Sequence, residues 1–189
     1  MYAARLKKSF DKFYMAPIEV WAQFADLCEE VSFKKNEIIK PAHTVAQHGY
    51  FILKGACGIF TWKVNNFVCT DLYVEDAFFG DDISLHTRKP TPLEILALED
   101  TKLLRISKAN MNTLKNTPFG TLLFLAGEEN SHIDKQNQQI DILTKTAEER
   151  YLDLLKNQPQ LLLRIHQKHI ASYLGITTQS LSRIRKKIQ

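Results

Sequence analysis

Amide, hydroxyl and basic side chains recur at helical spacing near the end of this 189-residue chain. Side chains three or four residues apart share one face of a helix. Those on the polar face are Gln179, Ser182, Arg183, Lys186 and Lys187. Guanidinium and amide groups hydrogen-bond the edges of bases, whereas ammonium groups bind phosphates. The chemistry that this face predicts is recognition of double-stranded DNA.

The polar face lies on the second of two short helices predicted in residues 167–189. Apolar residues at three- and four-residue spacing give each helix one buried face. They are Ile170, Ala171, Leu174, Leu181, Ile184 and Ile188. Gly175 can adopt the positive φ that ends the first helix, and Thr177 or Thr178 can cap the second. The pattern predicts a helix-turn-helix, with a solvated amphipathic helix pair as the alternative.

Charge is distributed unevenly along the chain, although the net charge is only +4. From residue 161 onward there are six basic and no acidic residues, while the first 160 residues carry a net charge of −2. A near-neutral body with a basic end suits a nucleic-acid reader, because neutralised phosphates supply affinity that is independent of sequence. A basic tail for solubility or for an acidic membrane is the alternative. The tail has no Trp or Phe to anchor it in a membrane.

The three cysteines indicate a reducing compartment. Cys28, Cys57 and Cys69 are odd in number and have apolar neighbours, which is typical of core thiols. The chain begins with an amphipathic stretch rather than the apolar run of a signal peptide. No stretch approaches the ~18 apolar residues of a membrane span. We therefore expect a cytoplasmic protein without a membrane partner.

The first 106 residues predict helices followed by many short strands. Residues 2–30 have helical periodicity, with Pro17 at a first helical position. Short runs rich in β-branched and aromatic residues follow, with no helix expected between them. These runs are 31–33, 37–39, 50–53, 57–62, 67–73, 93–98 and 102–106. Asn65-Asn66 between two of them indicates a tight hairpin. The spacing predicts an antiparallel double sheet of the jelly-roll type.

After Ser107 the helical period returns and persists. Apolar residues spaced by seven, together with Leu122, form a seam that is typical of a coiled-coil dimer contact. They are Phe119, Leu122, Ala126, Ile133 and Ile140. Packing of this helix on the sheet of its own chain is the alternative. A further helix is expected after Thr146, because Thr146 and Glu149 form a capping-box pattern.

This order of parts resembles the Crp/Fnr family of bacterial transcription regulators over nearly the whole chain. The matching motifs are Tyr50-Phe-Ile-Leu-Lys-Gly-Ala, Glu75-Asp-Ala-Phe-Phe-Gly-Asp, Ala97-Leu-Glu-Asp-Thr, Glu149-Arg-Tyr-Leu-Asp-Leu-Leu and residues 167–188. The resemblance implies an α+β fold and no enzymatic activity. It divides the chain into a cyclic-nucleotide-binding-like β-roll (1–116), a dimerisation helix (117–143) and a helix-turn-helix domain (144–189). It also implies a homodimer on two-fold symmetric DNA, with RNA polymerase as a further candidate partner.

The effector region departs from the family pattern for binding cyclic AMP. Gly80-Asp81 stands where that pattern has Gly-Glu, and Thr91-Pro92 stands where it has Arg-Ser. Loss of the Arg removes a bidentate cation for the phosphate, and Pro92 removes a backbone donor. We expect no cyclic AMP binding, and the effector is unknown. The candidate effector-pocket residues are Gly80, Asp81, Arg88, Thr91, Lys135 and Gln136.

The resemblance also assigns roles on the reading helix. The family's three base-contacting positions correspond to Thr178, Gln179 and Arg183. Arg183 could pair with guanine and Gln179 with adenine. The remaining hydroxyl and basic side chains are expected to contact phosphates. These are Thr177, Ser180, Lys186 and Lys187, with Ser182 beside them. The usual wing hairpin has little room between Pro159 and His166, so we expect it to be short or absent.

Other chemistries find little support in the sequence. His86 is a lone histidine near the expected pocket, which is insufficient for a haem sensor. The pair His166 and His169 has no evident third ligand for a metal. His43 and His48 do not form the cluster of a metal-dependent jelly-roll enzyme, and no catalytic constellation stands out. The functional alternative is a small-molecule-binding regulatory module that acts on a protein partner.

Overall fold

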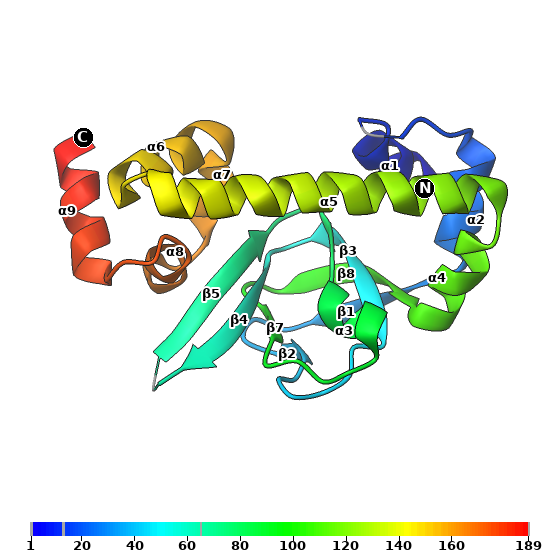
Figure 1. The fold of residues 1–189 in the computed structure, drawn as a ribbon, viewed down its shortest axis with the longest axis horizontal. Coiled ribbons are helices and arrows are strands. Elements are labelled where there is room, and N and C mark those ends of the chain that lie inside the picture. The colour runs from blue at the N-terminus through cyan, green and yellow to red at the C-terminus, as the bar shows by residue number, and fades with distance from the viewer. Residues whose placement is uncertain (1, 13, 65, 189) are drawn as a thin grey trace.

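The computed structural model describes residues 2–12, 14–64 and 66–188. The long helix α5 (Pro118–Thr144) runs the length of the molecule, with a β-roll along one side of it (Figure 1). Helices α1 (Tyr2–Phe10) and α2 (Ile18–Asp26) lie at one end of α5. The last helices of the chain lie at the other end. We call residues 147–188 the reading head.

The strands form two antiparallel four-stranded sheets. The order in the first sheet is β1 (Cys28–Phe33), β8 (Thr101–Ser107), β3 (His48–Lys54) and β6 (Phe78–Phe79). The order in the second sheet is β2 (Ile38–Lys40), β7 (Glu94–Ala97), β4 (Cys57–Lys63) and β5 (Asn66–Tyr73). The predicted α+β fold with an antiparallel β-roll is confirmed, and all seven expected strand runs are present.

Three details of the roll differ from the sequence-based expectations. Residues 28–30 belong to β1, so the predicted helix to residue 30 ends four residues early, at Asp26. The two-residue strand β6 was not expected. Helix α3 (Asp82–Thr87) stands in the connection that was expected to lack a helix. It forms because the Asp81 carboxylate accepts a hydrogen bond from the Ser84 N–H at 3.1 Å, which caps the first turn.

The hairpin between β4 and β5 is present where the sequence predicted it. Lys63 of β4 pairs with Asn66 of β5 at the end of the hairpin. Val64 there has a φ of 37°. Asn65, half of the predicted Asn-Asn turn, lies outside the described residues.

The helical part of the chain follows the roll. Helix α4 (Lys108–Lys115) leads into α5, and the reading head contains α6 (Ala147–Asn157), α7 (Pro159–Arg164), α8 (Gln167–Tyr173) and α9 (Thr178–Ile188). A Cβ on Gly120 would lie 1.8 Å from the Leu114 carbonyl oxygen, so the tight turn from α4 into α5 requires glycine. The predicted capping box is confirmed: Thr146 and Glu149 each bond the other's backbone N–H.

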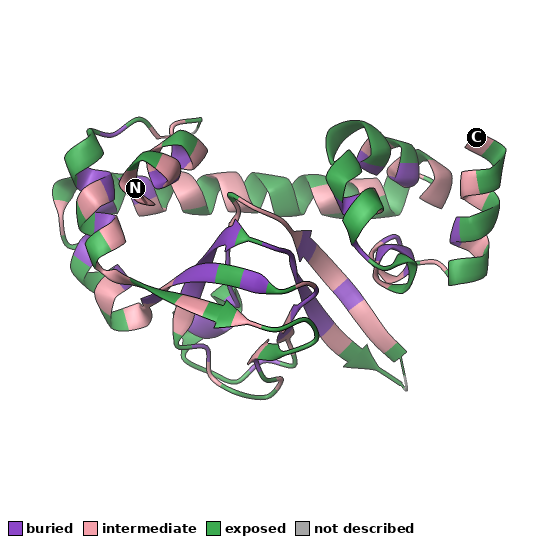
Figure 2. Cartoon of the chain, turned by 180° about the vertical axis from the view of Figure 1, so that it is seen from behind, coloured by how far each residue is buried: buried purple, intermediate pink, exposed green. Residues whose placement is uncertain are grey.

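Buried side chains form three clusters, and the strands carry much of this buried surface (Figure 2). The first cluster joins α1 and α2 to the first sheet around Phe10, Trp21, Phe24 and Phe51. The second fills the space between the sheets. The third contains residues of both the second sheet and the reading head, so the head shares a core with the roll.

Candidate nucleic-acid interface

Helix α9 presents the polar face that the sequence predicted. Leu181 is buried on its inner side, while Thr178, Gln179 and Arg183 are exposed. Ser182, Lys186 and Lys187 are also exposed, and Ser180 is half-buried. The Thr177 hydroxyl caps the helix by accepting a hydrogen bond from the Ser180 N–H at 3.1 Å. The head therefore presents amide, guanidinium and ammonium groups to solvent along one helix.

One of the predicted phosphate contacts already has a partner within the chain. The Lys187 ammonium lies 2.8 Å from both carboxylate oxygens of Glu148 on α6. Exposed ion pairs of this kind contribute little to stability. Lys187 can therefore exchange Glu148 for a phosphate at small cost.

The turn between α8 and α9 has the geometry that the sequence predicted. Gly175 has a φ of 70°, in the region that favours glycine. Arg150, which the sequence analysis did not single out as a contact, holds this turn from α6. Its guanidinium donates to the Leu174 carbonyl at 2.6 Å and to the Lys145 carbonyl at 2.8 Å. Arg150 thus links the end of α5 to the turn of the helix-turn-helix.

The segment where a wing hairpin was expected to be short or absent forms a helix. Pro159 supplies the first turn of α7, as its fixed φ and missing N–H permit. Helix α7 ends at Arg164, and His166 then caps α8 by accepting a hydrogen bond from the Lys168 N–H. No strand lies between α6 and α8 in this fully described part of the chain.

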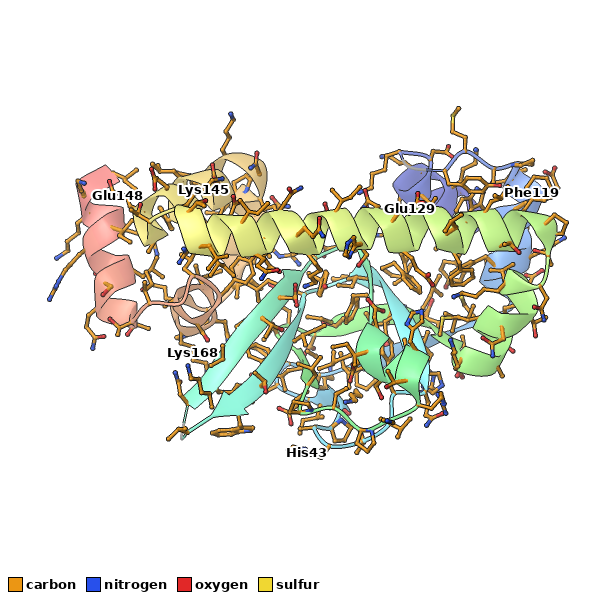
Figure 3. All side chains as sticks on the ribbon, in the orientation of Figure 1. His43, Phe119, Glu129, Lys145, Glu148 and Lys168 are labelled. Atoms are coloured by element: carbon orange, nitrogen blue, oxygen red, sulfur yellow. The ribbon has the colours of Figure 1, made fainter. Side chains whose placement is uncertain are left out.

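The predicted seam residues lie along α5 and are largely open to solvent. Ile133 is 56% exposed and Ile140 55% exposed, although both are large and apolar. Phe119 and Leu122 are similarly exposed, and Ala126 is half-buried. Figure 3 labels Phe119 and Glu129 on α5, and Lys145 and Glu148 at its junction with the reading head. An apolar stripe of this size on a helix usually marks an interaction site.

The predicted effector region is occupied by a buried network of the chain's own side chains. Lys40 and Asp81 are 5% and 0% exposed, and their charged groups lie 2.8 Å apart. The Lys40 ammonium also donates to the Thr91 hydroxyl at 3.1 Å and to the Leu93 carbonyl at 2.8 Å. The Thr91 hydroxyl in turn donates to Asp81. All three ammonium hydrogens therefore have acceptors.

The other predicted effector residues do not meet Asp81 and Thr91 at a common pocket. Arg88 turns to the Ala46 carbonyl and the Gln47 amide oxygen, both at 3.1 Å. Lys135 pairs with Asp71, and Gln136 bonds to His132 at 3.0 Å. A Cβ on Gly80 would lie 3.6 Å from the Cα of Gly49 on β3. A 550 Å³ hollow is lined by Arg88 and His86, and by His48 and Ser107 at the ends of β3 and β8.

Aromatic and aliphatic side chains fill the interior of the roll. Tyr73 stacks on Phe79 with ring centroids 5.0 Å apart, and Tyr50 lies 5.6 Å from Phe79. Burial raises the pKa of Tyr50 to about 12, so its hydroxyl stays neutral. Within the Lys40 network, the Lys40 cation is already paired with Asp81.

Burial changes the pKa of two cysteines and one histidine. Burial raises the pKa of the Cys28 and Cys57 thiols to about 12, as in unreactive core thiols. His169 packs edge-on against Phe60, and burial lowers its pKa to about 4. No cluster of three or more metal-ligating side chains occurs among the described residues. None of the helices in that part of the chain is long and apolar enough to cross a membrane.

Comparison with known proteins agrees with this architecture. Residues 30–117 match the family model of the cyclic nucleotide-binding domain. No curated protein matches the sequence. The fold is similar to that of FixK2 from Bradyrhizobium japonicum, with a TM-score of 0.72 at 19% identity over 85% of this chain and 84% of that one.

Two further structures are named as regulators. The c-di-GMP responsive global regulator CLP of Xanthomonas campestris has a TM-score of 0.69 at 15% identity, and 92% of each chain is covered. The catabolite activator protein of Thermus thermophilus has a TM-score of 0.56 at 19% identity over 92% of this chain and 83% of that one.

Residues 30–117 thus resemble a cyclic nucleotide-binding domain, and 85–92% of the chain has a fold similar to those of FixK2, CLP and the catabolite activator protein. The resemblance noted in the sequence is confirmed at the level of the fold.

Proposed function

We propose that the protein is a transcription regulator that binds two-fold symmetric DNA as a homodimer. The observation that carries the proposal is that one chain exposes both an apolar seam and a polar helix face. An exposed apolar seam runs along α5, and the exposed polar face of α9 lies beyond its carboxyl end. A two-fold axis along the seam would present two copies of α9 to the same side of a duplex.

Base readout falls to the exposed residues near the start of α9. Arg183 has the fork that pairs with guanine O6 and N7, and the Gln179 amide matches adenine N6 and N7. Both side chains are exposed, with Thr178 beside them. Lys186, Lys187 and the hydroxyls of Thr177 and Ser180 would bind phosphates and set the register of the helix. Arg183 and Gln179 are the determinants of the preferred half-site.

The sensor domain, in this proposal, does not use cyclic AMP. The buried Lys40–Asp81–Thr91 network supports this view, because it satisfies the Lys40 ammonium at the place where a phosphate would bind. Opening the site would leave the Asp81 carboxylate buried without its cation, which is costly. The roll would then serve mainly as a scaffold for the seam and the reading head.

Selection of preferred duplexes from a random pool tests the function, followed by titration of the selected site. Arg183→Ala should weaken binding to that site by roughly 1–3 kcal/mol and relax specificity at one base pair. Lys156→Gln is the matched control, because it removes an exposed cation of α6 rather than one of α9. Added cyclic AMP should leave the affinity unchanged.

Two outcomes would contradict the proposal. The first is a selected pool without any consensus. The second is residual duplex binding that Arg183→Ala does not alter. Duplex affinity that hardly changes with salt would instead favour a module whose last helices bind a protein partner, since phosphate neutralisation makes DNA binding steeply dependent on salt.

A further inference from the structure

Arg164, at the end of α7, joins the reading head to two loops of the roll. Its guanidinium donates to both oxygens of Glu75, at 2.6 and 2.9 Å. It also donates to both oxygens of Glu99, at 3.3 and 2.6 Å. Glu75 follows β5 and Glu99 follows β7. One side chain of the head is therefore held by two carboxylates that lie 89 and 65 residues away in sequence.

The Arg164 contact has the geometry of an ion pair that contributes measurably to stability. Most exposed ion pairs are weak, but bidentate pairs within a network are the exception. The Glu75 carboxylate is itself anchored, because it accepts a hydrogen bond from the Gly55 N–H at 2.8 Å. Hydrogen bonds from Arg164 are the main cause of the lowered pKa of Glu75, about 2. Arg164 thus meets a preformed acceptor on the roll.

A second set of contacts joins the head to strand β5, an edge strand of the second sheet. The Ser172 hydroxyl accepts a hydrogen bond from the Cys69 N–H at 2.8 Å and donates one to the Phe67 carbonyl at 3.1 Å. The Ser172 hydroxyl therefore bonds two backbone groups of β5 that a neighbouring strand would otherwise bond. His169 packs against Phe60 beside it. These contacts cover the edge of the sheet and fix the position of α8.

Helix α9 follows from α8 through a tight turn and shares its core. Leu174 and Leu181 lie in the same buried cluster as Phe60 and Leu72 of the roll. The direction of the reading face relative to α5 is therefore set by contacts with the roll as well as by the connection at the end of α5. In a dimer, that direction determines the distance between the two reading faces.

We propose that Arg164 is a positioning residue that sets the spacing between the two half-sites the protein accepts. This inference rests on the proposed function, since spacing has meaning only for a dimer on DNA. The seam on α5 fixes one roll relative to the other, and Arg164 fixes each head relative to its own roll. Without Arg164, each head can turn about the end of α5 and meet half-sites at other distances at a lower cost.

The test measures affinity for duplexes in which the spacing of the selected half-sites changes by single base pairs. The full-length protein is compared with Arg164→Gln, and Lys156→Gln again controls for the lost charge. Arg164→Gln should bind the best-spaced site roughly tenfold more weakly. It should lose much less affinity than the parent protein when spacing departs from the optimum. Affinity for a single half-site should not change, because Arg164 lies outside the reading face.

Several results would overturn the inference. It fails if Arg164→Gln keeps the parent's dependence on spacing, or if Lys156→Gln broadens that dependence equally. A parent protein without any duplex preference would refute the proposed function, and the inference with it. Circular dichroism and gel filtration establish that each variant is folded. If Arg164→Gln does not fold, Glu99→Gln removes only one of the two carboxylates, and the same outcomes apply to it.

Discussion

Lys40 is a buried charged side chain that compensates the buried charge of Asp81. Its ammonium has three acceptors, and Asp81 accepts hydrogen bonds from the Ser84 N–H and the Thr91 hydroxyl in addition to its ion pair. A buried pair of this kind adds little compared with apolar residues of the same size, but removing one partner leaves an uncompensated charge. The two carboxylate oxygens of Asp81 join β2, α3 and the segment before β7 through Lys40, Ser84 and Thr91.

Lys40→Met should therefore destabilise the fold by about 3–5 kcal/mol, because Asp81 then stays buried without its cation. The double variant Lys40→Met with Asp81→Asn should recover most of that loss, since the Asn oxygen can still cap α3. Urea unfolding of both variants measures the difference. Equal stability of the single and double variants would show that the ion pair is not what stabilises this region.

Single residues also show where sequence reasoning reached its limit. The exposed face of α9 could be predicted because its residues lie within twelve positions and follow helical spacing. The contacts of Lys40 with Asp81 and of Arg164 with Glu75 join residues that are far apart in sequence. No local period connects them, so only the folded chain brings them together. Arg150 was visible as part of a motif, but its hydrogen bond to the Leu174 carbonyl was not.

Helix α5 combines a polar composition with an exposed apolar seam. Its 27 residues span about 40 Å, and Glu129 stands at a seam position between Ala126 and Ile133. In a parallel dimer, the two Glu129 carboxylates would face each other near the two-fold axis, at some loss of stability. Such polar seam positions fix register and orientation in coiled coils.

Glu129→Leu should strengthen dimerisation by about 1–2 kcal/mol, because two like charges leave the seam and apolar area replaces them. Asp134→Leu is the control, since it adds the same side chain at an exposed position outside the seam. Sedimentation equilibrium gives the dimer dissociation constant of each variant. If both substitutions tightened association equally, the gain would come from general hydrophobicity rather than from the seam.

The elements that the sequence predicted best are those with a long period or a local cap. The helix-turn-helix, the capping box at Thr146 and the seven strand runs satisfy this condition. Helix α3 was missed because six residues hold too few turns for a period to show. Strand β6 has only two residues and forms by pairing with β3, a non-local contact. The position of the head on the roll also depends on contacts between residues far apart in sequence, so no local pattern predicts it.

At the scale of the whole molecule, the head and the roll share one buried cluster. Their shared cluster contains buried residues from β4 and β5 together with residues from α6, α7, α8 and α9. Around it stand the Arg164 contact, the Ser172 contact and the half-buried ring of His169. Titration of groups at this junction should therefore change the stability of the entire chain.

The titration of His169 tests whether the junction couples the head to the roll. Burial lowers its pKa from 6.5 to about 4, so the unfolded chain binds a proton at this ring at a higher pH than the folded chain does. The stabilisation that depends on a neutral ring is thus complete above pH 6.5 and is lost as the pH falls toward 4. The loss should amount to about 1–2 kcal/mol, because a half-exposed ring titrates with a reduced penalty.

His169→Leu should flatten the pH dependence of urea unfolding in this window, whereas exposed His43→Asn should not. A single cooperative transition that shifts only through His169 would establish that the junction couples head and roll. Two separate transitions, with only one sensitive to His169, would refute it.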